Sequence, residues 1–311
     1  MSEHECATEI WDAQAVSSMP GSDEVRTIGG HGTGAIAELH PYGRPIDVYR
    51  AFTEPPQDND TPEKRFGRAV EPILLMWAQL ELLGEGAELT PGVKTRSQIH
   101  PLLHSHPDAV FNGNAKYSAG LVSAKHVGGY SARHWGSSKT DRVPDYAAIQ
   151  ETIYCGQTGH SVSYVVASIG GKAPELWTVP FHQQMFDDLV ALDYGFYRHH
   201  ILPRIPPPPD GSKRYKAWIN ETIKQKSAEL IKVATGDEMH YVVEKYREAR
   251  VKAHAAAVAL ELADQTLRKA IGDDAGLELV ESKEKITYKA NIRGIRSLRV
   301  PKSFTSGDED E

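Results

Sequence analysis

Residues 104–113 read His-Ser-His-Pro-Asp-Ala-Val-Phe-Asn-Gly, and residues 121–127, after a polar gap, read Leu-Val-Ser-Ala-Lys-His-Val. Both runs are short, rich in β-forming residues and bounded by Gly, Asn or Ser, which is typical of successive strands in a hairpin. The first strand opens with Pro107-Asp108, which puts a carboxylate at the edge of the strand. Side chains alternate between the faces of a strand, so Ser123 and Lys125 share one face of the second strand.

An acid on one strand and a lysine on the same face of its neighbour suit a magnesium-dependent phosphodiesterase. In such a site Asp108 holds the metal, and Lys125 orients or deprotonates the attacking water. Sites of this kind usually carry a second carboxylate where this chain has Ser123.

Composition sets broad limits on the class of protein. The chain has 311 residues, of which 25% are charged and 40% hydrophobic, enough for one large domain or one domain plus an appendage. We expect no membrane span and no signal peptide, because no long apolar run occurs. Two cysteines, Cys6 and Cys155, exclude a disulfide framework and a four-cysteine cluster, and favour a reducing cytoplasm. A net charge of −7 argues against bulk attraction to nucleic acid but permits a local basic track.

A helix is predicted from Thr61 to about Leu83, because a capping hydroxyl, a proline and an acid open it. Apolar residues at helical spacing predict its buried stripe: Phe66, Val70, Ile73, Leu74, Trp77 and Leu80. Glu71 lies at the edge of that stripe, and periodicity alone favours a surface acid.

The remaining pattern predicts a strand at 91–99, a helix at 145–155, strands at 161–169 and 175–179, and a helix at 181–201. We predict a loose arm over 1–24, a core domain over 25–205, a stiff proline-rich linker over 206–212 and an acidic tail over 304–311. Residues 213–303 are helical and basic. They are expected to form a helical hairpin over 227–270 that is broken near Gly236, followed by a strand pair over 277–300.

Two segments have two interpretations each: a contact with phosphate, or a purely structural role. The glycine-rich segment after Arg26 could place helix amides, with Arg26 and Thr33, against a phosphate, or it could be a plain loop–helix junction. The C-terminal strand pair carries six basic residues, Lys283, Lys285, Lys289, Arg293, Arg296 and Arg299. These could contact a phosphate backbone, or they could protect an edge strand from aggregation.

Six motifs in order resemble one family. They are Arg26-Thr-Ile-Gly-Gly, Pro41-Tyr-Gly-Arg-Pro-Ile-Asp-Val-Tyr, Arg65-Phe-Gly-Arg-Ala-Val-Glu-Pro, His106-Pro-Asp-Ala-Val, Val122-Ser-Ala-Lys and Gln150-Glu-Thr-Ile-Tyr. Together they resemble the PD-(D/E)XK nuclease superfamily, specifically the lambda exonuclease-like, YqaJ-type viral recombinases, over about residues 26–203. The resemblance implies an α/β fold in which helices flank a central mixed sheet, with a C-terminal helical appendage.

The resemblance also implies an activity and its partners: a 5′-to-3′ exonuclease that resects double-stranded DNA ends for phage recombination. The cofactor would be Mg²⁺, with Mn²⁺ able to substitute. The implied partners are a single-strand annealing protein and further copies of the chain in a trimeric ring. The implied setting is the cytoplasm of a bacterial host that carries a phage or prophage.

The resemblance gives roles to individual residues. Glu71 and Asp108 would hold the metal, Lys125 would assist the nucleophilic water, and Gln150 would lie near the active centre. Arg26 would grip the terminal phosphate.

The chain departs from the family pattern at two places. The usual Glu-x-Lys is here Ser123-Ala-Lys125, and the usual Gly-Gly-Ser-Asp is here Gly29-Gly-His-Gly32. A hydroxyl ligates Mg²⁺ more weakly than a carboxylate.

Three explanations of Ser123 remain open. In the first, the acid has migrated to Glu151 or Asp145 on the next helix, although Glu151 points about 100° away from Gln150 around a helix. In the second, Ser123 disables cleavage and leaves a catalytically impaired DNA-binding homologue. In the third, one well-held ion supports weaker catalysis. A separate alternative is a zinc site formed by His100, His104, His106 and Asp108.

Overall fold

The computed structural model describes residues 26–56, 60–226, 228–301 and 304. The chain divides into two compact units, Met1–Lys224 and Gln225–Glu311. The predicted N-terminal arm and, apart from Phe304, the acidic tail lie outside the described residues. Within the described part of the chain, no helix is both long and apolar enough to cross a membrane.

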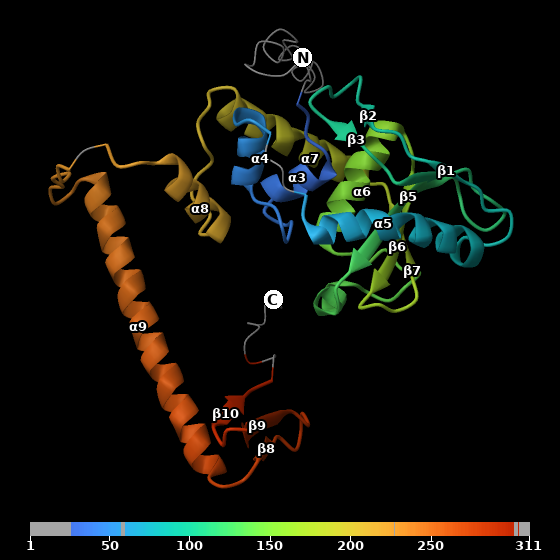
Figure 1. The fold of residues 1–311 in the computed structure, drawn as a ribbon. Coiled ribbons are helices and arrows are strands. Elements are labelled where there is room, and N and C mark those ends of the chain that lie inside the picture. The colour runs from blue at the N-terminus through green and yellow to red at the C-terminus, as the bar shows by residue number, and fades with distance from the viewer. Residues whose placement is uncertain (1–25, 57–59, 227, 302–303, 305–311) are drawn as a thin grey trace. The chain divides into compact units, whose positions relative to one another are not determined.

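The first unit is built on a five-stranded mixed sheet with the strand order β1-β4-β5-β6-β7 (Figure 1). The strands are β1 (Leu89–Pro91), β4 (Ala109–Phe111), β5 (Gly120–Val127), β6 (Val162–Ile169) and β7 (Glu175–Pro180). β4 and β5 pair antiparallel, which confirms the predicted hairpin, whereas β5 and β6 pair parallel. A separate small ribbon pairs β2 (Thr95–Arg96) with β3 (His104–Ser105), so the predicted strand at 91–99 is interrupted. The mixed α/β fold class is confirmed.

Helix α6 (Asp145–Thr158) confirms the helix predicted over 145–155, and it makes the crossover between the parallel strands β5 and β6. Pro144 precedes its first turn, where a missing N–H costs nothing, and Asp145 lies near the positive end of the helix dipole. Gly159 ends the helix with φ 75°, a left-handed conformation that glycine adopts without steric cost. This connection fixes which side chains of α6 face the sheet.

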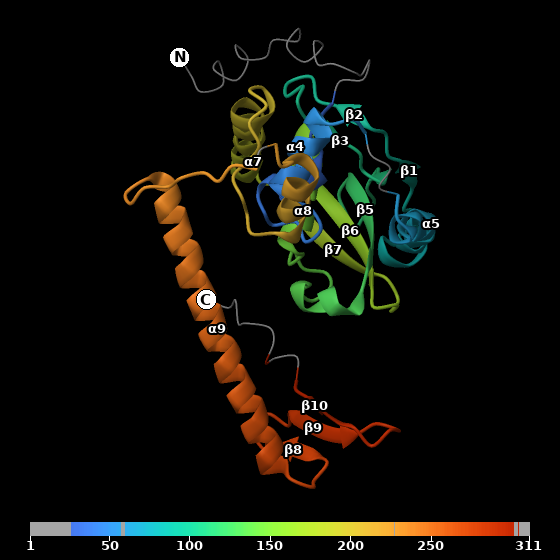
Figure 2. The same ribbon diagram turned by 60° about the vertical axis from the view of Figure 1, so that its left-hand side comes forward.

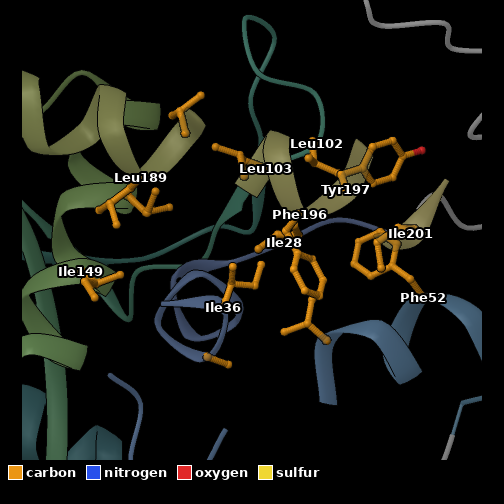
Figure 3. Close-up of a cluster of buried hydrophobic side chains, with 14 of the residues drawn as sticks. Ile28, Ile36, Phe52, Leu102, Leu103, Ile149, Leu189, Phe196, Tyr197 and Ile201 are labelled. Carbon is orange, nitrogen blue, oxygen red and sulfur yellow. The ribbon is translucent and has the colours of Figure 1, made fainter. Parts of the chain in front are cut away.

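The two faces of the sheet are covered by different helices. On one face, Leu121 of β5 joins a core with α6, α3 (Gly30–Ile36), α4 (Pro45–Thr53) and α7 (Gln183–Phe196) (Figure 3). On the other face, the next residue, Val122, packs against α5 (Pro62–Trp77) and the π-helical turn η1 (Ala78–Leu82). A 3-10 helix, η2 (Gly129–His134), follows β5.

The buried stripe predicted for α5 is wrong in its orientation. Leu74 is buried and Val70 is half-buried, but Phe66, Ile73 and Leu80 are exposed by 56%, 57% and 67%. The face of α5 that packs on the sheet is centred on Leu74, with Val70 and Leu75 beside it and Ala78 in the turn that follows. Glu71 is therefore half-buried instead of lying on the solvent side.

The first unit continues beyond the predicted linker. After α7 and the π-helical turn η3 (Tyr197–Ile201), the proline segment leads into α8 (Lys213–Thr222). Tyr215 and Trp218 of α8 are buried in the same core as α4. Burial of these two aromatic rings ties α8 to the first unit, so the compact unit ends at Lys224 and not at the prolines.

The second unit contains one long helix and a small sheet. α9 (Glu238–Ile271) is followed by β8 (Gly276–Glu278), β9 (Lys285–Ala290) and β10 (Arg296–Arg299), which form a sheet in the order β10-β9-β8 (Figure 2). The predicted helical hairpin is wrong, because Gly236 and Asp237 precede the single helix instead of dividing two. The predicted strand pair is present and gains a third strand.

Candidate functional site

The candidate site lies on the α6 face of the central sheet. Ala109 of β4 pairs with Val122 of β5, and both side chains belong to the core on the α5 face. Because side chains alternate along strands, Asp108, Ser123 and Lys125 fall on the opposite face, toward α6. The structure thus brings the predicted acid and lysine to the same face.

Asp108 stands immediately before β4, half-buried. Its Oδ2 accepts a hydrogen bond of 2.7 Å from the backbone N–H of Ala124. This bond holds the carboxylate against β5, one residue from Lys125. A carboxylate fixed through one oxygen keeps its second oxygen for another ligand.

Lys125 connects the sheet to α6. Its Nζ donates a 3.0 Å hydrogen bond to Oε1 of Gln150 and lies 4.0 Å from Oε1 of Glu151. The lysine side chain is 18% exposed, whereas Glu151 is fully buried. The ammonium is therefore held on its helix side and retains access to solvent.

Glu151 lies beside Ser123, although its position next to Gln150 on a helix suggested otherwise. Its Oε2 accepts hydrogen bonds from the hydroxyls of Ser123, at 2.9 Å, and Ser163, at 2.7 Å. A helix that crosses a sheet can direct two consecutive side chains toward it, one on each side of the line of contact. The angular argument against Glu151 is therefore wrong, and the carboxylate occupies the space next to the missing Glu-x-Lys acid.

The environment of Glu151 is electrostatically unusual. Burial raises the pKa of its carboxyl, while the charge of Lys125 and the hydroxyls of Ser163 and Ser123 oppose that rise. Its Oε1 is buried and has no hydrogen-bond partner. A buried acceptor without a partner is costly in a folded protein, and such groups often mark a site that binds something.

Glu71 belongs to the same electrostatic neighbourhood. Burial raises the pKa of its carboxyl, and the negative charge of Asp108 raises it further, while His106 and Lys125 lower it. Helix α5 packs on the face of the sheet opposite α6, and the charge of Asp108 nevertheless acts on Glu71. Sequence periodicity, which favoured a surface acid, missed this placement.

Two residues predicted to contact a phosphate are engaged elsewhere. Thr33 is fully buried, and its hydroxyl donates a 2.7 Å hydrogen bond to Oδ2 of Asp193. The Thr33 hydroxyl is therefore not accessible to a ligand in this structure. The Nη1 atom of Arg26 donates to the carbonyl oxygens of Ala51, at 2.6 Å, and Glu54, at 2.8 Å, at the end of α4.

The histidine-rich segment does not form the zinc cluster that was considered. The Nδ1 atom of His104 lies 2.9 Å from the hydroxyl of Thr27, and the ring of His100 packs against Phe186 and Tyr194. Burial lowers the pKa of His104 to about 4. These contacts direct the two imidazoles toward different parts of the core.

Two other histidines flank the site, and sequence analysis did not single them out as a pair. The ring centroids of His31 and His40 are 3.9 Å apart. Burial lowers the pKa of both, to about 4 for His40, and the positive charge of Lys125 lowers both further. The two histidines lie close together in sequence, around the Gly-His-Gly-Thr-Gly segment, and this was the only signal for the pair. Their ring contact depends on the turn between them, which the sequence does not reveal.

The donor set is compatible with a hard divalent cation. Among the described residues, no group of three His, Cys, Asp or Glu side chains is arranged to hold a metal ion. Mg²⁺, however, is commonly held by one or two carboxylates together with water and substrate phosphates. Asp108, the nearby Glu71 and the unpartnered oxygen of Glu151 supply carboxylate oxygens of the required kind.

Comparison with known proteins gives structural likenesses at low sequence identity. No family model matches the chain, and no curated protein matches it. The structure is similar to the crystal structure of an alkaline exonuclease (LHK-Exo) from Laribacter hongkongensis, with a TM-score of 0.44 and 12% identity over 67% of this chain and 100% of that chain. The same enzyme in complex with dAMP gives a TM-score of 0.44 and 12% identity, over 68% and 99% of the two chains. A structure titled SSO0001 gives a TM-score of 0.34 and 10% identity, over 64% and 88%.

Proposed function

We propose that the first unit is a metal-dependent DNA nuclease whose centre is formed by Asp108, Glu71, Lys125, Gln150 and Glu151. The observation that carries the proposal is the position of Lys125, whose ammonium contacts Gln150 and approaches Glu151 on the sheet face that also bears Asp108. An acid that can hold a divalent ion, anchored beside a lysine, suits the hydrolysis of a phosphodiester.

Each side chain has a distinct task in this proposal. A bound divalent ion would act as a Lewis acid toward the phosphate oxygens. Asp108, fixed by the N–H of Ala124, and Glu71 would hold that ion. The ammonium of Lys125, kept in place by Gln150, would donate a hydrogen bond to the attacking water or to the charge that develops on the phosphate.

Glu151 would supply the carboxylate that Ser123 lacks. Ser123 donates its hydroxyl proton to Glu151, and so fixes the acid from the strand instead of replacing it as a ligand. The buried, unpartnered Oε1 would then face Lys125 and the ion. The arrangement supports migration of the acid from strand to helix.

The finer features of the proposal come from the motif resemblance. They are 5′-to-3′ resection of duplex ends for phage-type recombination, use of Mg²⁺ or Mn²⁺, a trimeric ring, and a single-strand annealing protein as partner in the cytoplasm of a bacterial host. Arg26 would contact the terminal phosphate only if the ligand displaced its bonds to Ala51 and Glu54.

The test is digestion of linear duplex DNA with a label on one strand, with and without a 5′-phosphate, in the presence of Mg²⁺. The wild-type chain is expected to release nucleotides from the 5′-phosphorylated strand. Lys125→Met is expected to lose a factor of about 10² to 10⁴ in rate, the usual contribution of a group that acts on a proton in the transition state. Lys172→Met, at an exposed position after β6, is the matched control and should cleave normally.

Binding of the duplex without cleavage would overturn this proposal. That result would instead support the catalytically impaired homologue. Cleavage from the 3′ end, or of closed circular DNA alone, would retain a nuclease but overturn the proposed direction of resection.

A further inference from the structure

A basic β-hairpin closes the second unit. It consists of β9, β10 and the turn between them, and residues 285–300 contain five Lys or Arg and no Asp or Glu. The chain as a whole carries 42 acidic against 35 basic residues. This segment therefore has a net positive charge, whereas the whole chain has a net negative charge.

The two faces of the hairpin differ in character. Register pairs Tyr288 with Leu298, and Ile286 on the same face is buried, as is Ile271 at the end of α9. Side chains on the other face alternate with these. That outer face carries only basic and hydroxyl side chains along the paired strands: Lys285, Thr287 and Lys289 on β9, with Ser297 and Arg299 on β10.

Arg296 fixes the hairpin in place. Its guanidinium donates to the carbonyl oxygens of Gly272, Asp274 and Tyr288, and it stacks on the Tyr288 ring 4.0 Å from the centroid. Arg268 of α9 also contacts that ring, at 5.0 Å. Of the basic residues in the segment, Arg296 thus has a structural role and anchors the strands to the helix end.

Three other cations remain available. Lys289, Arg293 and Arg299 are exposed, and none forms an ion pair within the described part of the chain. Lys285, in contrast, lies 3.4 Å from Glu278 on the neighbouring strand. Unpaired cations on one face of a rigid ribbon form a surface that attracts a polyanion.

The turn adds an apolar tip between the cations. Oδ1 of Asn291 accepts hydrogen bonds from the backbone N–H groups of Arg293 and Ile295, which orders the turn. Ile292 has no burial at all, with a relative exposure of 103%. An ordered, exposed isoleucine beside Arg293 is suited to contact base edges or the sugar surface in a groove.

We propose that the outer face and tip of the β9–β10 hairpin bind duplex DNA, apart from the nuclease centre. A two-stranded β-ribbon fits the major groove, with cations and hydroxyls on the phosphates and the tip toward the bases. The choice of DNA as the polyanion rests on the proposed function of the first unit. The surface would hold the duplex while the nuclease centre acts on it.

The test compares the full chain with a triple variant, Lys289→Gln, Arg293→Gln and Arg299→Gln. Affinity for a fluorescent duplex is measured by anisotropy in EDTA, so that no cleavage occurs, over a range of salt concentrations. The slope of log K against log salt is expected to become shallower by about 2 to 3, because each phosphate contact contributes about 0.9. Affinity at low salt is expected to fall at least about tenfold on the same grounds.

The control is a second triple variant with the same loss of charge, Arg250→Gln, Lys252→Gln and Lys269→Gln, at exposed positions of α9. It should keep the wild-type slope to within one unit. An unchanged slope in the hairpin variant, or an equal change in the control, would overturn the proposal.

Two further measurements separate this proposal from its rivals. Ile292→Ser should weaken DNA binding several-fold without changing the salt slope. Unchanged affinity would show that the tip of the hairpin does not contact the DNA. Anionic lipid vesicles that bind the wild-type chain as well as DNA does, and lose binding in the hairpin variant, would overturn DNA as the partner. If the wild-type chain binds DNA through the hairpin but cleaves none, the proposed nuclease function is overturned and the proposed DNA-binding surface is supported.

Discussion

Exchanging the residues at positions 123 and 151 tests whether the acid of the candidate centre has moved from the strand to the helix. The Oγ atom of Ser123 is 2.9 Å from Oε2 of Glu151, and both residues are fully buried. Ser123→Glu alone would place two carboxylates within a few ångströms of each other. Two like charges about 4 Å apart repel by about 4 kcal/mol at an effective dielectric constant of about 20.

The expected stabilities follow from that repulsion. Ser123→Glu should lower the free energy of unfolding by about 4 kcal/mol near neutral pH, and by less at lower pH, where one carboxyl takes up a proton. Glu151→Ser should cost about 1 to 3 kcal/mol through lost buried hydrogen bonds. The double variant removes the repulsion and makes room for the new side chain, so it should recover at least about 2 kcal/mol relative to Ser123→Glu.

Urea unfolding followed by tryptophan fluorescence measures these differences, and Trp135 and Trp177 are buried reporters. Ser118→Glu, at an exposed position, controls for the added charge. In the nuclease assay Glu151→Ser should be inactive and the double variant active again. Additive stabilities, or full activity in Glu151→Ser, would refute the idea that Glu151 replaces the strand acid.

Four further variants test the packing and electrostatics of the first unit. Burial raises the pKa of Asp193 from 3.8 to about 8, so between these two pH values the folded state keeps a proton that the unfolded state has lost. The free energy of unfolding should therefore fall as the pH rises from about 4 to about 8, by on the order of 1 kcal/mol per pH unit. Asp193→Asn should flatten this pH profile, measured by urea unfolding. Gly30→Ala should lower the temperature of thermal unfolding, because the new Cβ would lie 2.6 Å from a backbone atom of α6. Gly67→Ala, at a helix position with open space around it, should instead raise the free energy of unfolding by about 0.5 to 1 kcal/mol. Ser163→Ala should cost about 1.5 to 3 kcal/mol and, by removing a bond that lowers the pKa of Glu151, should move the acid limb of any pH–activity profile to higher pH.

Much of the first unit followed from local sequence signals. Alternation along 121–127 correctly placed Ser123 and Lys125 on one face, and Pro144 and Gly159 bound α6 as their backbone preferences require. The order of the hairpin, crossover helix and following strand could therefore be predicted. These features depend on neighbours in sequence, and the patterns reflect them directly.

The errors arose where distant segments compete for one surface. Helix α5 carries apolar residues around much of its surface, and only its packing on the sheet buries Leu74 and leaves Phe66 and Ile73 exposed. The proline run looked like a boundary, but Tyr215 and Trp218 beyond it are buried in the first core. Likewise Glu151 seemed to point away, because periodicity describes a helix alone and not its line of contact with a sheet.

The most direct measurement of the central claim is single-turnover cleavage of linear duplex DNA as a function of Mg²⁺ concentration, in the wild-type chain and in Asp108→Asn. We predict cleavage that rises to saturation with Mg²⁺ in the wild type and is at least about a hundredfold slower in the variant at every concentration, because a metal-binding carboxylate is lost. Equal rates in the two proteins, or undiminished cleavage in EDTA, would contradict the account.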